Sequence, residues 1–218
     1  MDLQHTPSEV ATQARELLER ILSTQRTDRS RNLVPGQVDA LCQGWRAWAR
    51  ELEKPDPAML AAEVAAAEKR LSIVANLGAL GIRVWGDQGW KLTSQHGVRP
   101  MGRAGHGKEI NAIYAGSLVN LDVNRLYQPD IVTMRVFDVL ACGGFVLAEH
   151  NDAIEELFEP GVHLDCWRDT DELLAKARHY IAHPDEARRI ARAGRERVLR
   201  QHTVTQRLET MLQVAGLD

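Results

Sequence analysis

Two aspartates and an arginine in the stretch DIVTMRVFDVLACGGFVLAE, residues 130 to 149, have the types and spacing best suited to chemistry. Asp130 and Asp138 are separated by seven residues, with Arg135 between them. If the stretch is helical, eight steps turn the chain by about 800°, which leaves the carboxylates about 80° apart in azimuth and about 12 Å apart along the axis. A single small group cannot bridge that distance. An extended nucleotide-sugar can, because each carboxylate accepts two hydroxyl hydrogen bonds.

A helix, a glycine turn and a buried strand are expected to position these side chains. From Ile131 to Cys142 the apolar residues recur at helical spacing, and the Pro-Asp pair before them supplies a start signal. Gly143 and Gly144 then end the helix where a left-handed C-cap is needed. The apolar run from Phe145 to Ala148 is typical of a buried parallel strand.

Three blocks of sequence resemble one known family. TMRVFDVLACGGFVLAE, YAGSLVNLDVNR and HPDEARRIARAGRERVLRQHTVTQR together look like the C-terminal part of the CgeB-like glycosyltransferases. These belong to the GT-B class, glycosyl transferases group 1, whose retaining members often carry a Glu-x7-Glu pair. The resemblance covers the chain from about residue 85 onward. It implies an α/β fold: a Rossmann-like three-layer domain with a parallel sheet, the donor-binding C-terminal half of a GT-B enzyme, preceded here by an α-helical N-terminal segment.

The resemblance also implies roles for individual residues. Asp138 matches the carboxylate that holds the nucleotide ribose, and Asp130 matches the position that faces the donor sugar. Both are Asp in this chain, where Glu is the commoner letter. Asp122 likewise stands where the family often has Asn, and Tyr114 matches a tyrosine on the helix that follows a glycine loop.

That glycine loop, GRAGHGKE at residues 102 to 109, matches the letters G-x-x-x-x-G-K of a phosphate-binding loop. A nucleoside triphosphatase is rejected, because Glu109 stands where a magnesium-binding hydroxyl belongs and the preceding HGVRPM is a poor buried strand. Gly105 and Gly107 nevertheless precede a helix from about Lys108 to Ala115, whose free amides and dipole attract anions. The basic residues that would meet a diphosphate there, or be only solvated loop charge, are Arg103, His106 and Lys108.

Other candidates follow predicted strands, because ligands of open α/β sheets bind beyond the carboxyl ends of the strands. They are Gly86 and Asp87 after a strand at 82–85, Asn120, Asp122 and Arg125 around the exit of a strand at 117–123, and Glu149 with His150 after the strand at 145–148. A plain turn or an exposed loop histidine is the competing interpretation. As a set, the proposed catalytic residues are Asp130 and Arg135, and the donor-binding residues are Asp138, Gly143, Gly144, Glu149, Gly105, Lys108, Tyr114 and Asn120.

The remaining segments predict a helical N-terminal segment, residues 1–57, and a Rossmann-like domain, residues 58–218. Helices are expected at 7–25, through Val38 to Trp48 and at 57–79. Trp45 and Trp48 are interpreted as packing residues rather than as platforms for a base. After the site, a helix at 152–158, a strand at 162–167 and helices at 169–182, 185–201 and 203–215 are expected. The arginines of 185–201 are assigned to a solvated face. The resemblance implies that the last helix crosses back from the C-terminal domain and docks against upstream residues.

Composition excludes several classes of function. With 218 residues, 44% of them hydrophobic, and a net charge of −3, the chain has no general attraction for nucleic acid or an anionic membrane. Its three cysteines show no CxxC spacing, so neither a disulfide framework nor a zinc site is expected, and a reducing cytoplasm fits. No run approaches the ~20 apolar residues of a membrane span.

These features favour a glycosyltransferase, or its donor-binding half, that moves a sugar from a nucleotide-diphosphate donor to an unknown acceptor. Asp138 would hold the ribose, and glycine-loop amides with Arg135 would stabilise the leaving diphosphate, so that no metal or other cofactor is required. A GT-B enzyme has two Rossmann-like domains, so acceptor contacts would come from a separate domain or chain. The alternative is a non-catalytic nucleotide-sugar-binding or assembly subunit. An epimerase predicts G-x-G-x-x-G after the first strand, and that motif is absent.

Overall fold

The computed structural model describes residues 7–217, and their side chains from residue 12 onward. Contacts divide the chain into two compact units. The helical unit runs to Ser72 and also contains Arg125–Pro129, whereas the α/β unit contains Ile73–Asn124 and the chain from Asp130 onward. The chain therefore passes between the two units three times. The domain limits expected from the sequence, 1–57 and 58–218, stay a prediction.

The helical unit is built from α1 (Pro7–Thr27), α2 (Val34–Leu41), α3 (Trp45–Glu51) and most of α4 (Pro57–Asn76). One face of α4 is almost entirely alanine, which lets the apolar side chains of α1 and α2 approach its backbone closely. The buried residues of this core are Ile21, Leu22, Val34, Val38, Cys42, Ala58, Ala61, Ala62, Ala65, Ala66 and Leu126. Removing this apolar surface from water stabilises the unit.

Two expectations for the helical unit are wrong. The single helix predicted through Val38 to Trp48 is two helices, because Gly44 adopts φ +79° at the start of α3 and breaks the run. Trp45 and Trp48 are not packing residues, since 45% and 58% of their surfaces are exposed. The turn at Gly44 places both on the outer face of a seven-residue helix whose buried residue is Ala49.

The α/β unit contains two parallel sheets. Strands β1 (Arg83–Trp85) and β2 (Arg99–Gly102) form one, and β3 (Asn120–Asp122), β4 (Val146–Glu149) and β5 (Asp165–Trp167) form the other in the order β3-β4-β5. Asp122 pairs with Ala148, and Glu149 pairs with Trp167, so the carboxyl ends of the three strands lie at one edge. The expected α/β architecture with parallel strands is confirmed, although the strands are shorter than predicted and lie in two sheets.

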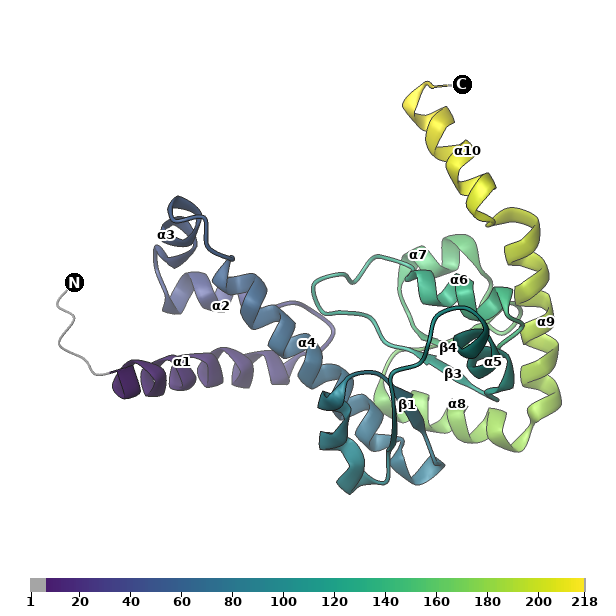
Figure 1. Cartoon of the computed structure of the whole chain (residues 1–218), viewed down its shortest axis with the longest axis horizontal. Coiled ribbons are helices and arrows are strands. Elements are labelled where there is room, and N and C mark those ends of the chain that lie inside the picture. Colours follow the sequence, from purple (N-terminus) through teal and green to yellow (C-terminus); the bar gives the residue numbers. More distant parts are fainter. Residues whose placement is uncertain (1–6, 218) are drawn as a thin grey trace. The chain divides into compact units, whose positions relative to one another are not determined.

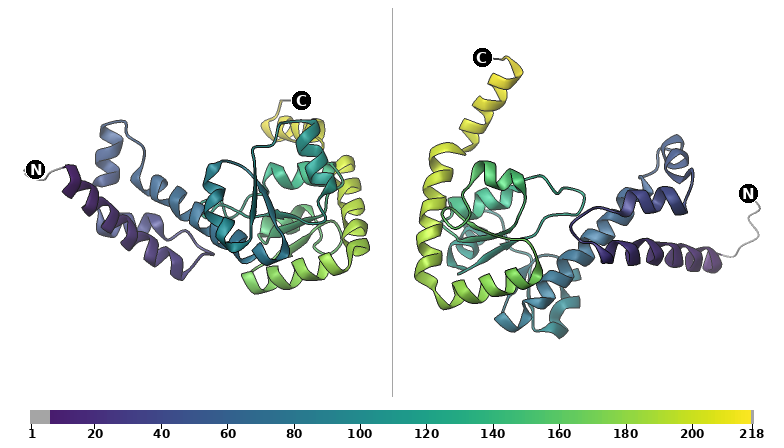
Figure 2. Two further views of the ribbon diagram at one scale, coloured as in Figure 1. Left: turned by 60° about the horizontal axis from the view of Figure 1, so that its bottom comes forward. Right: turned by 180° about the vertical axis from the view of Figure 1, so that it is seen from behind.

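Both faces of the three-stranded sheet are covered, which makes three layers (Figures 1 and 2). Along β4 the buried side chains alternate between two cores: Leu147 packs with residues of α8 (Thr170–Ala182), and Val146 and Ala148 pack with α6 (Met134–Ala141) and α7 (Asp152–Leu157). This explains why the strand is apolar from Val146 to Ala148, as in sheets buried on both sides. Also in this unit are α5 (Lys108–Gly116) and the short helices Gly78–Leu80 and Gln88–His96.

Helix α9 (Pro184–Gln201) fixes the position of α6. A Cβ at Gly194 would lie 2.1 Å from the carbonyl oxygen of His163 and 2.7 Å from Cδ2 of Leu140, so only glycine fits there. Two of the arginines assigned to the solvated face also bond helix ends. Nε of Arg195 donates to the carbonyl of Ala141 at 3.1 Å, and Nε of Arg197 donates to Leu157 at the same distance. Both carbonyls belong to last turns that lack an intrahelical donor.

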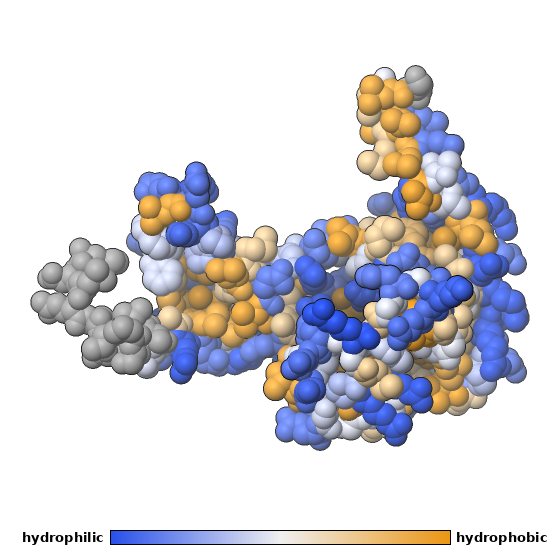
Figure 3. Space-filling view, in the orientation of Figure 1, coloured by the Kyte–Doolittle hydropathy of each residue, from blue (hydrophilic) through white to orange (hydrophobic). Residues whose placement is uncertain are grey.

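Helix α10 (Val204–Ala215) begins with a capping box between Thr203 and Gln206. None of its residues is buried, although in its first turn the guanidinium of Arg207 lies 5.1 Å from the centre of the Phe137 ring of α6. Its apolar side chains gather on one exposed face, as Figure 3 shows for the C-terminal helix. The large ones are Val204, Leu208, Met211, Leu212 and Val214.

Candidate functional site

The candidate site lies at the carboxyl edge of β3, β4 and β5, where polar residues follow each strand. Asp122 is the last residue of β3, and its side chain is 3% exposed. Nη1 of Arg135 donates to its Oδ1 at 2.7 Å, and Oγ1 of Thr133 lies 3.2 Å from both carboxylate oxygens. Burial raises the pKa of Asp122, while the positive charge of Arg135 and the Thr133 hydroxyl oppose the rise. The aspartate therefore fixes Arg135, whose side chain is still 45% exposed.

Glu149, the last residue of β4, and Asn151, two positions further on, hold the two ends of the loop that leads from β3 to α6. Oε2 of Glu149 accepts a hydrogen bond of 2.9 Å from the backbone amide of Asn124. The Asn151 amide group donates to the carbonyl of Ile131 at 3.0 Å, and its oxygen caps α7. The carboxylate of Glu149 therefore holds the backbone of the loop at Asn124 and does not point freely into solvent.

Asn124, Thr133 and Asn151 also belong to the candidate site, although they were not among the residues predicted for it. Asn124 is 4% exposed, and its Oδ1 has no hydrogen-bond partner within the described protein. Buried polar groups normally have a hydrogen-bond partner, and ligands of open α/β sheets bind beyond the carboxyl ends of the strands, so this unpaired acceptor is a candidate ligand contact. The available signals were weak: Asn151 precedes an acidic helix start, which is an N-cap pattern, and Thr133 stands one position before a helix.

The helix predicted from Ile131 to Cys142 begins three residues later, at Met134, and this changes the geometry expected for the paired aspartates. Thr133 is the N-cap residue, and Asp130 lies in a turn outside the helix. The separation of about 12 Å and 80° worked out for a continuous helix is therefore wrong. Asp130 and Asp138 are both exposed, and neither carboxylate is hydrogen-bonded or ion-paired to another described residue. Asp138, in the second turn of α6, lies near enough to Tyr114 and Cys142 to raise the pKa of each, after the larger effect of burial.

The glycine pair after α6 forms the predicted helix end. Gly143 adopts φ +80°, its amide bonds the carbonyl of Leu140 at 2.9 Å, and the amide of Gly144 bonds Val139 at 2.9 Å. These two bonds make a Schellman motif. The chain can then enter β4 directly, which is why α6 and β4 pack together.

Tyr114, Asn120 and Gly144 meet at a packing junction rather than in an open cleft. The amide group of Asn120 donates to the carbonyls of Tyr114 and Phe145, each at 3.1 Å. A Cβ on Gly144 would lie 2.6 Å from the Tyr114 carbonyl and 2.8 Å from Nδ2 of Asn120. The structure thus brings together three predicted donor-binding residues, and their contacts hold α5, β3 and β4 in place.

The glycine loop places its own carboxylate at the start of α5. Oε2 of Glu109 accepts the backbone amide of Gly105 at 2.7 Å, and Gly107, with φ +75°, is the N-cap residue. The carboxylate of Glu109 therefore accepts the hydrogen bond of the Gly105 amide, which was expected to bind a phosphate. Arg103, His106 and Lys108 are all exposed. Asp87 has a similar local role, since its Oδ1 accepts the amide of Gly89 at 2.7 Å.

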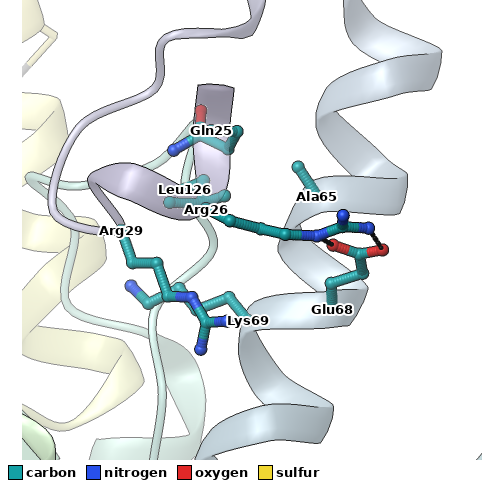
Figure 4. Close-up of a pocket in the computed structure, with 7 residues that line it drawn as sticks. All are labelled: Gln25, Arg26, Arg29, Ala65, Glu68, Lys69 and Leu126. Carbon is teal, nitrogen blue, oxygen red and sulfur yellow. Dashed lines mark hydrogen bonds and ion pairs between the residues drawn. The ribbon is translucent and has the colours of Figure 1, made fainter. Parts of the chain in front are cut away.

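A basic recess lies in the helical unit and is separate from these residues. Figure 4 shows the guanidinium of Arg26 on α1 forked onto Glu68 of α4, at 2.7 Å and 3.0 Å, with Leu126 beside them. Arg29 donates to Oγ of Ser72 at 2.6 Å. Because these cations are already paired within the protein, the recess is a structural junction between helices.

Among the described residues, no three His, Cys, Asp or Glu side chains cluster as metal ligands would, and the need for a metal stays untested. The free thiols Cys42 and Cys166 are buried, and burial raises the pKa of Cys166 to about 12. No described helix is long and apolar enough to cross a membrane.

Comparison with known proteins agrees with this arrangement. The model of the glycosyl transferase-like family matches residues 62–213, which is more than half of the chain. A solved structure, sucrose-phosphate synthase from Thermosynechococcus elongatus, aligns with a TM-score of 0.55 at 20% identity, over 67% of this chain and 41% of that one. At this identity the likeness shows the fold, a Rossmann-like domain, and the chain spans less than half of that enzyme's length. No curated protein is similar enough in sequence to count as a match.

Proposed function

Because the chain belongs to the glycosyl transferase-like family, we propose that it binds a nucleotide-diphosphate sugar at the carboxyl edge of β3, β4 and β5. It acts either as a glycosyltransferase of GT-B type or as the donor-binding half of one. The observation that carries this proposal is Asp138, an exposed and unpaired carboxylate in the second turn of α6. The Schellman motif and the contact with α9 hold this helix in place, so the carboxylate has a fixed base.

Asp138 has the chemistry to hold a ribose. A carboxylate accepts hydrogen bonds from two neighbouring hydroxyls, and a charged acceptor makes each bond stronger than a neutral one does. An internal partner would compete for the same oxygens, and Asp138 has none among the described residues. The resemblance to the CgeB-like family gives this position the same role. We therefore propose that Asp138 is the carboxylate that holds the ribose.

Arg135 is the proposed contact for the diphosphate. Its Nη1 is engaged by Asp122, and the exposed part of the guanidinium leaves other N–H groups for an anion. Being held by a buried carboxylate reduces the cost of ordering the side chain when a ligand binds. Positive charge at this point would stabilise the diphosphate as negative charge grows on it in the transition state.

The donor sugar is proposed to face Asp130, on the turn that precedes α6. A residue in a turn can be adjusted by the loop around it, whereas a residue within the helix moves only with the helix. Acceptor contacts are proposed to come from a separate domain or chain, because this chain spans 41% of the similar solved structure. No metal is invoked in this scheme.

Calorimetric titration with UDP, GDP, ADP and TDP tests the proposal. One nucleoside diphosphate is expected to bind, and Asp138→Ala is expected to weaken it by about 1.5–3 kcal/mol, the contribution of hydrogen bonds to a charged group. The matched control is Glu196→Ala, which removes a 70% exposed carboxylate from α9 in the same unit. Unchanged affinity in Asp138→Ala, or an equal loss in both variants, would reject the ribose assignment.

A non-catalytic nucleotide-sugar-binding or assembly subunit is the second candidate, favoured by the position of Asp130, which lies in an exposed turn outside α6 and has no described partner that would orient its carboxylate. Turnover distinguishes the two candidates. If the protein binds a nucleoside diphosphate and yet neither hydrolyses nor transfers the sugar of the matching donor, even with excess acceptor alcohols, the non-catalytic role is correct.

A further inference from the structure

Asn124 has a buried side-chain amide whose oxygen lacks a hydrogen-bond partner. The residue is 4% exposed, and no donor among the described residues reaches Oδ1. Its backbone is held, in contrast, because the amide N–H donates to Oε2 of Glu149 at 2.9 Å. Buried polar atoms are nearly always paired, and an unpaired acceptor costs stability. Asn124 is therefore fixed at its backbone and lacks a donor for its side-chain oxygen.

Asn124 stands at one end of a row of polar residues just beyond the carboxyl edge of the sheet. The register of β3, β4 and β5, extended by two residues past Asp122 and Cys166, aligns Asn124, His150 and Arg168. Neighbouring strands lie about 4.8 Å apart, so a ligand ring that approaches this edge meets two neighbours in the row. All three residues belong to the α/β unit.

The row lies on the face of the sheet that α6 and α7 cover. Oε1 of Glu155, in the first turn of α7, lies 2.8 Å from Nε2 of His150 and 3.5 Å from Nη2 of Arg168. Side chains alternate along an extended chain, which places Asn124 on the side of Asp122, whose carboxylate bonds a residue of α6. The three side chains of the row therefore share one face, and Glu155 holds two of them.

This row is richer in hydrogen-bond acceptors than a phosphate site would be. The carboxylate of Glu155 is an acceptor, so Nε2 of a neutral His150 carries the proton and Nδ1 is left to accept. Oδ1 of Asn124 is a second neutral acceptor. Hydroxyl groups supply the donors that both atoms need, whereas the oxygens of a diphosphate are themselves acceptors. Arg168, whose side chain is 60% exposed, has N–H groups for the oxygens of the same ligand. The chemistry of the row therefore fits a sugar ring.

We propose that Asn124 is a specificity-determining residue, whose Oδ1 accepts a hydrogen bond from a ring hydroxyl of the donor sugar, with His150 beside it. The inference rests on the proposed function and adds to it the atoms that recognise the sugar. The diphosphate stays assigned to Arg135 and the ribose to Asp138. A deoxy sugar would leave Oδ1 unpaired, and a site built for a hydroxyl discriminates strongly against a ligand that lacks it.

Asn124→Leu tests first whether Oδ1 is unpaired in the ligand-free protein. Leucine is similar in size and has no polar side-chain atom, so the urea midpoint of unfolding is expected to stay unchanged or to rise. The matched comparison is Asn120→Leu, which is expected to lower the midpoint, because the Asn120 amide group donates to two carbonyls at 3.1 Å. A midpoint that falls as far in Asn124→Leu as in Asn120→Leu would overturn the proposal. The oxygen would then already have a partner, such as a buried water.

The role at the sugar is measured by calorimetric titration with UDP-, GDP-, ADP- and TDP-glucose, followed by the 2-, 3-, 4- and 6-deoxyglucose forms of the donor that binds. One deoxy donor is expected to bind the wild type about tenfold to a hundredfold more weakly than the glucose donor. Asn124→Leu is expected to abolish this difference and to bind the nucleoside diphosphate within about twofold of the wild type. Asn111→Leu, at an exposed asparagine of α5, is the matched control and should keep the difference.

The outcomes separate this inference from the proposed function. If the wild type binds none of the four nucleotide-glucose donors or their diphosphates, the proposed function fails and this inference with it. If it binds a donor and every deoxy form binds equally well, or if the difference persists in Asn124→Leu, the role of Asn124 is refuted and the proposed function stands.

Discussion

Replacing Arg135 by methionine tests the electrostatics at the edge of the sheet. Methionine keeps a flexible apolar stem and removes the charge, so that Asp122 loses its 2.7 Å bond and retains only the Thr133 hydroxyl. A hydrogen bond to a charged group contributes about 1.5–3 kcal/mol, and we expect the free energy of unfolding at pH 7 to fall by that amount. The loss falls short of the penalty for a fully buried pair, because Arg135 is 45% exposed and water screens it.

The pH dependence of this loss gives the sharper test. Since burial raises the pKa of Asp122, the native chain holds its proton to a higher pH than the unfolded chain does. This group's contribution to stability is therefore greatest below its unfolded pKa and falls as pH rises through its folded pKa. Without Arg135 the folded pKa rises further. The difference between variant and wild type should consequently be large at pH 7 and shrink as pH falls and Asp122 becomes protonated.

Urea-induced unfolding at a series of pH values measures both effects. The double variant with Asp122→Asn completes the cycle, because removing the carboxylate should make Arg135→Met nearly neutral. A loss below about 0.5 kcal/mol at pH 7, or a loss that is the same at pH 4 and pH 7, would refute the assignment of a buried, arginine-neutralised carboxylate.

Two further substitutions check the packing and the thiols. Gly194→Ala is expected to lower the free energy of unfolding by about 1–3 kcal/mol, because its Cβ would meet the carbonyl of His163 at 2.1 Å, and this outweighs the helix propensity gained. Gly116→Ala at the end of α5, with nothing within 4 Å, should be neutral or stabilising, and a destabilised Gly116→Ala with an unaffected Gly194→Ala would contradict the packing account. In a timed thiol-reagent assay at pH 8, Cys142 should react well before Cys166, whose buried thiol has its pKa raised to about 12, and modification of Cys166 first would show that the core opens readily.

The sequence could predict those parts of the fold in which a single local rule determines the secondary structure. Gly143 and Gly144 had to end a helix, and the apolar run after them had to be a strand covered on both faces, as β4 is. The start of α6 escaped prediction because Val132 and Ile131 continue the apolar spacing, whereas the chain at Thr133 is extended in order to reach Asp122. That contact joins residues 11 positions apart and leaves no periodic signal.

The sequence predicted where the candidate site lies, at the carboxyl edge of the sheet. It predicted the hydrogen-bond partners of the site residues less well. Asp122 and Glu149 are the last residues of β3 and β4, so their position at the carboxyl edge follows from the parallel order of the strands. Their partners depend on loops: Glu149 bonds the amide of Asn124, and Glu109 bonds Gly105. The exposure of Trp48 was likewise not visible in its spacing, because a single positive-φ glycine redirects the helix that carries it.

The junction of Tyr114, Asn120 and Gly144 limits what mutagenesis can establish about ligand recognition. Asn120 ties a helix end to a strand entry through two carbonyls, so its removal would loosen the sheet whether or not a ligand touches it. Reduced binding in such a variant would be evidence of a damaged scaffold. Substitutions are informative about ligand binding where the side chain makes no hydrogen bond or ion pair within the protein. Among the predicted donor-binding residues, Asp138 meets this condition most directly.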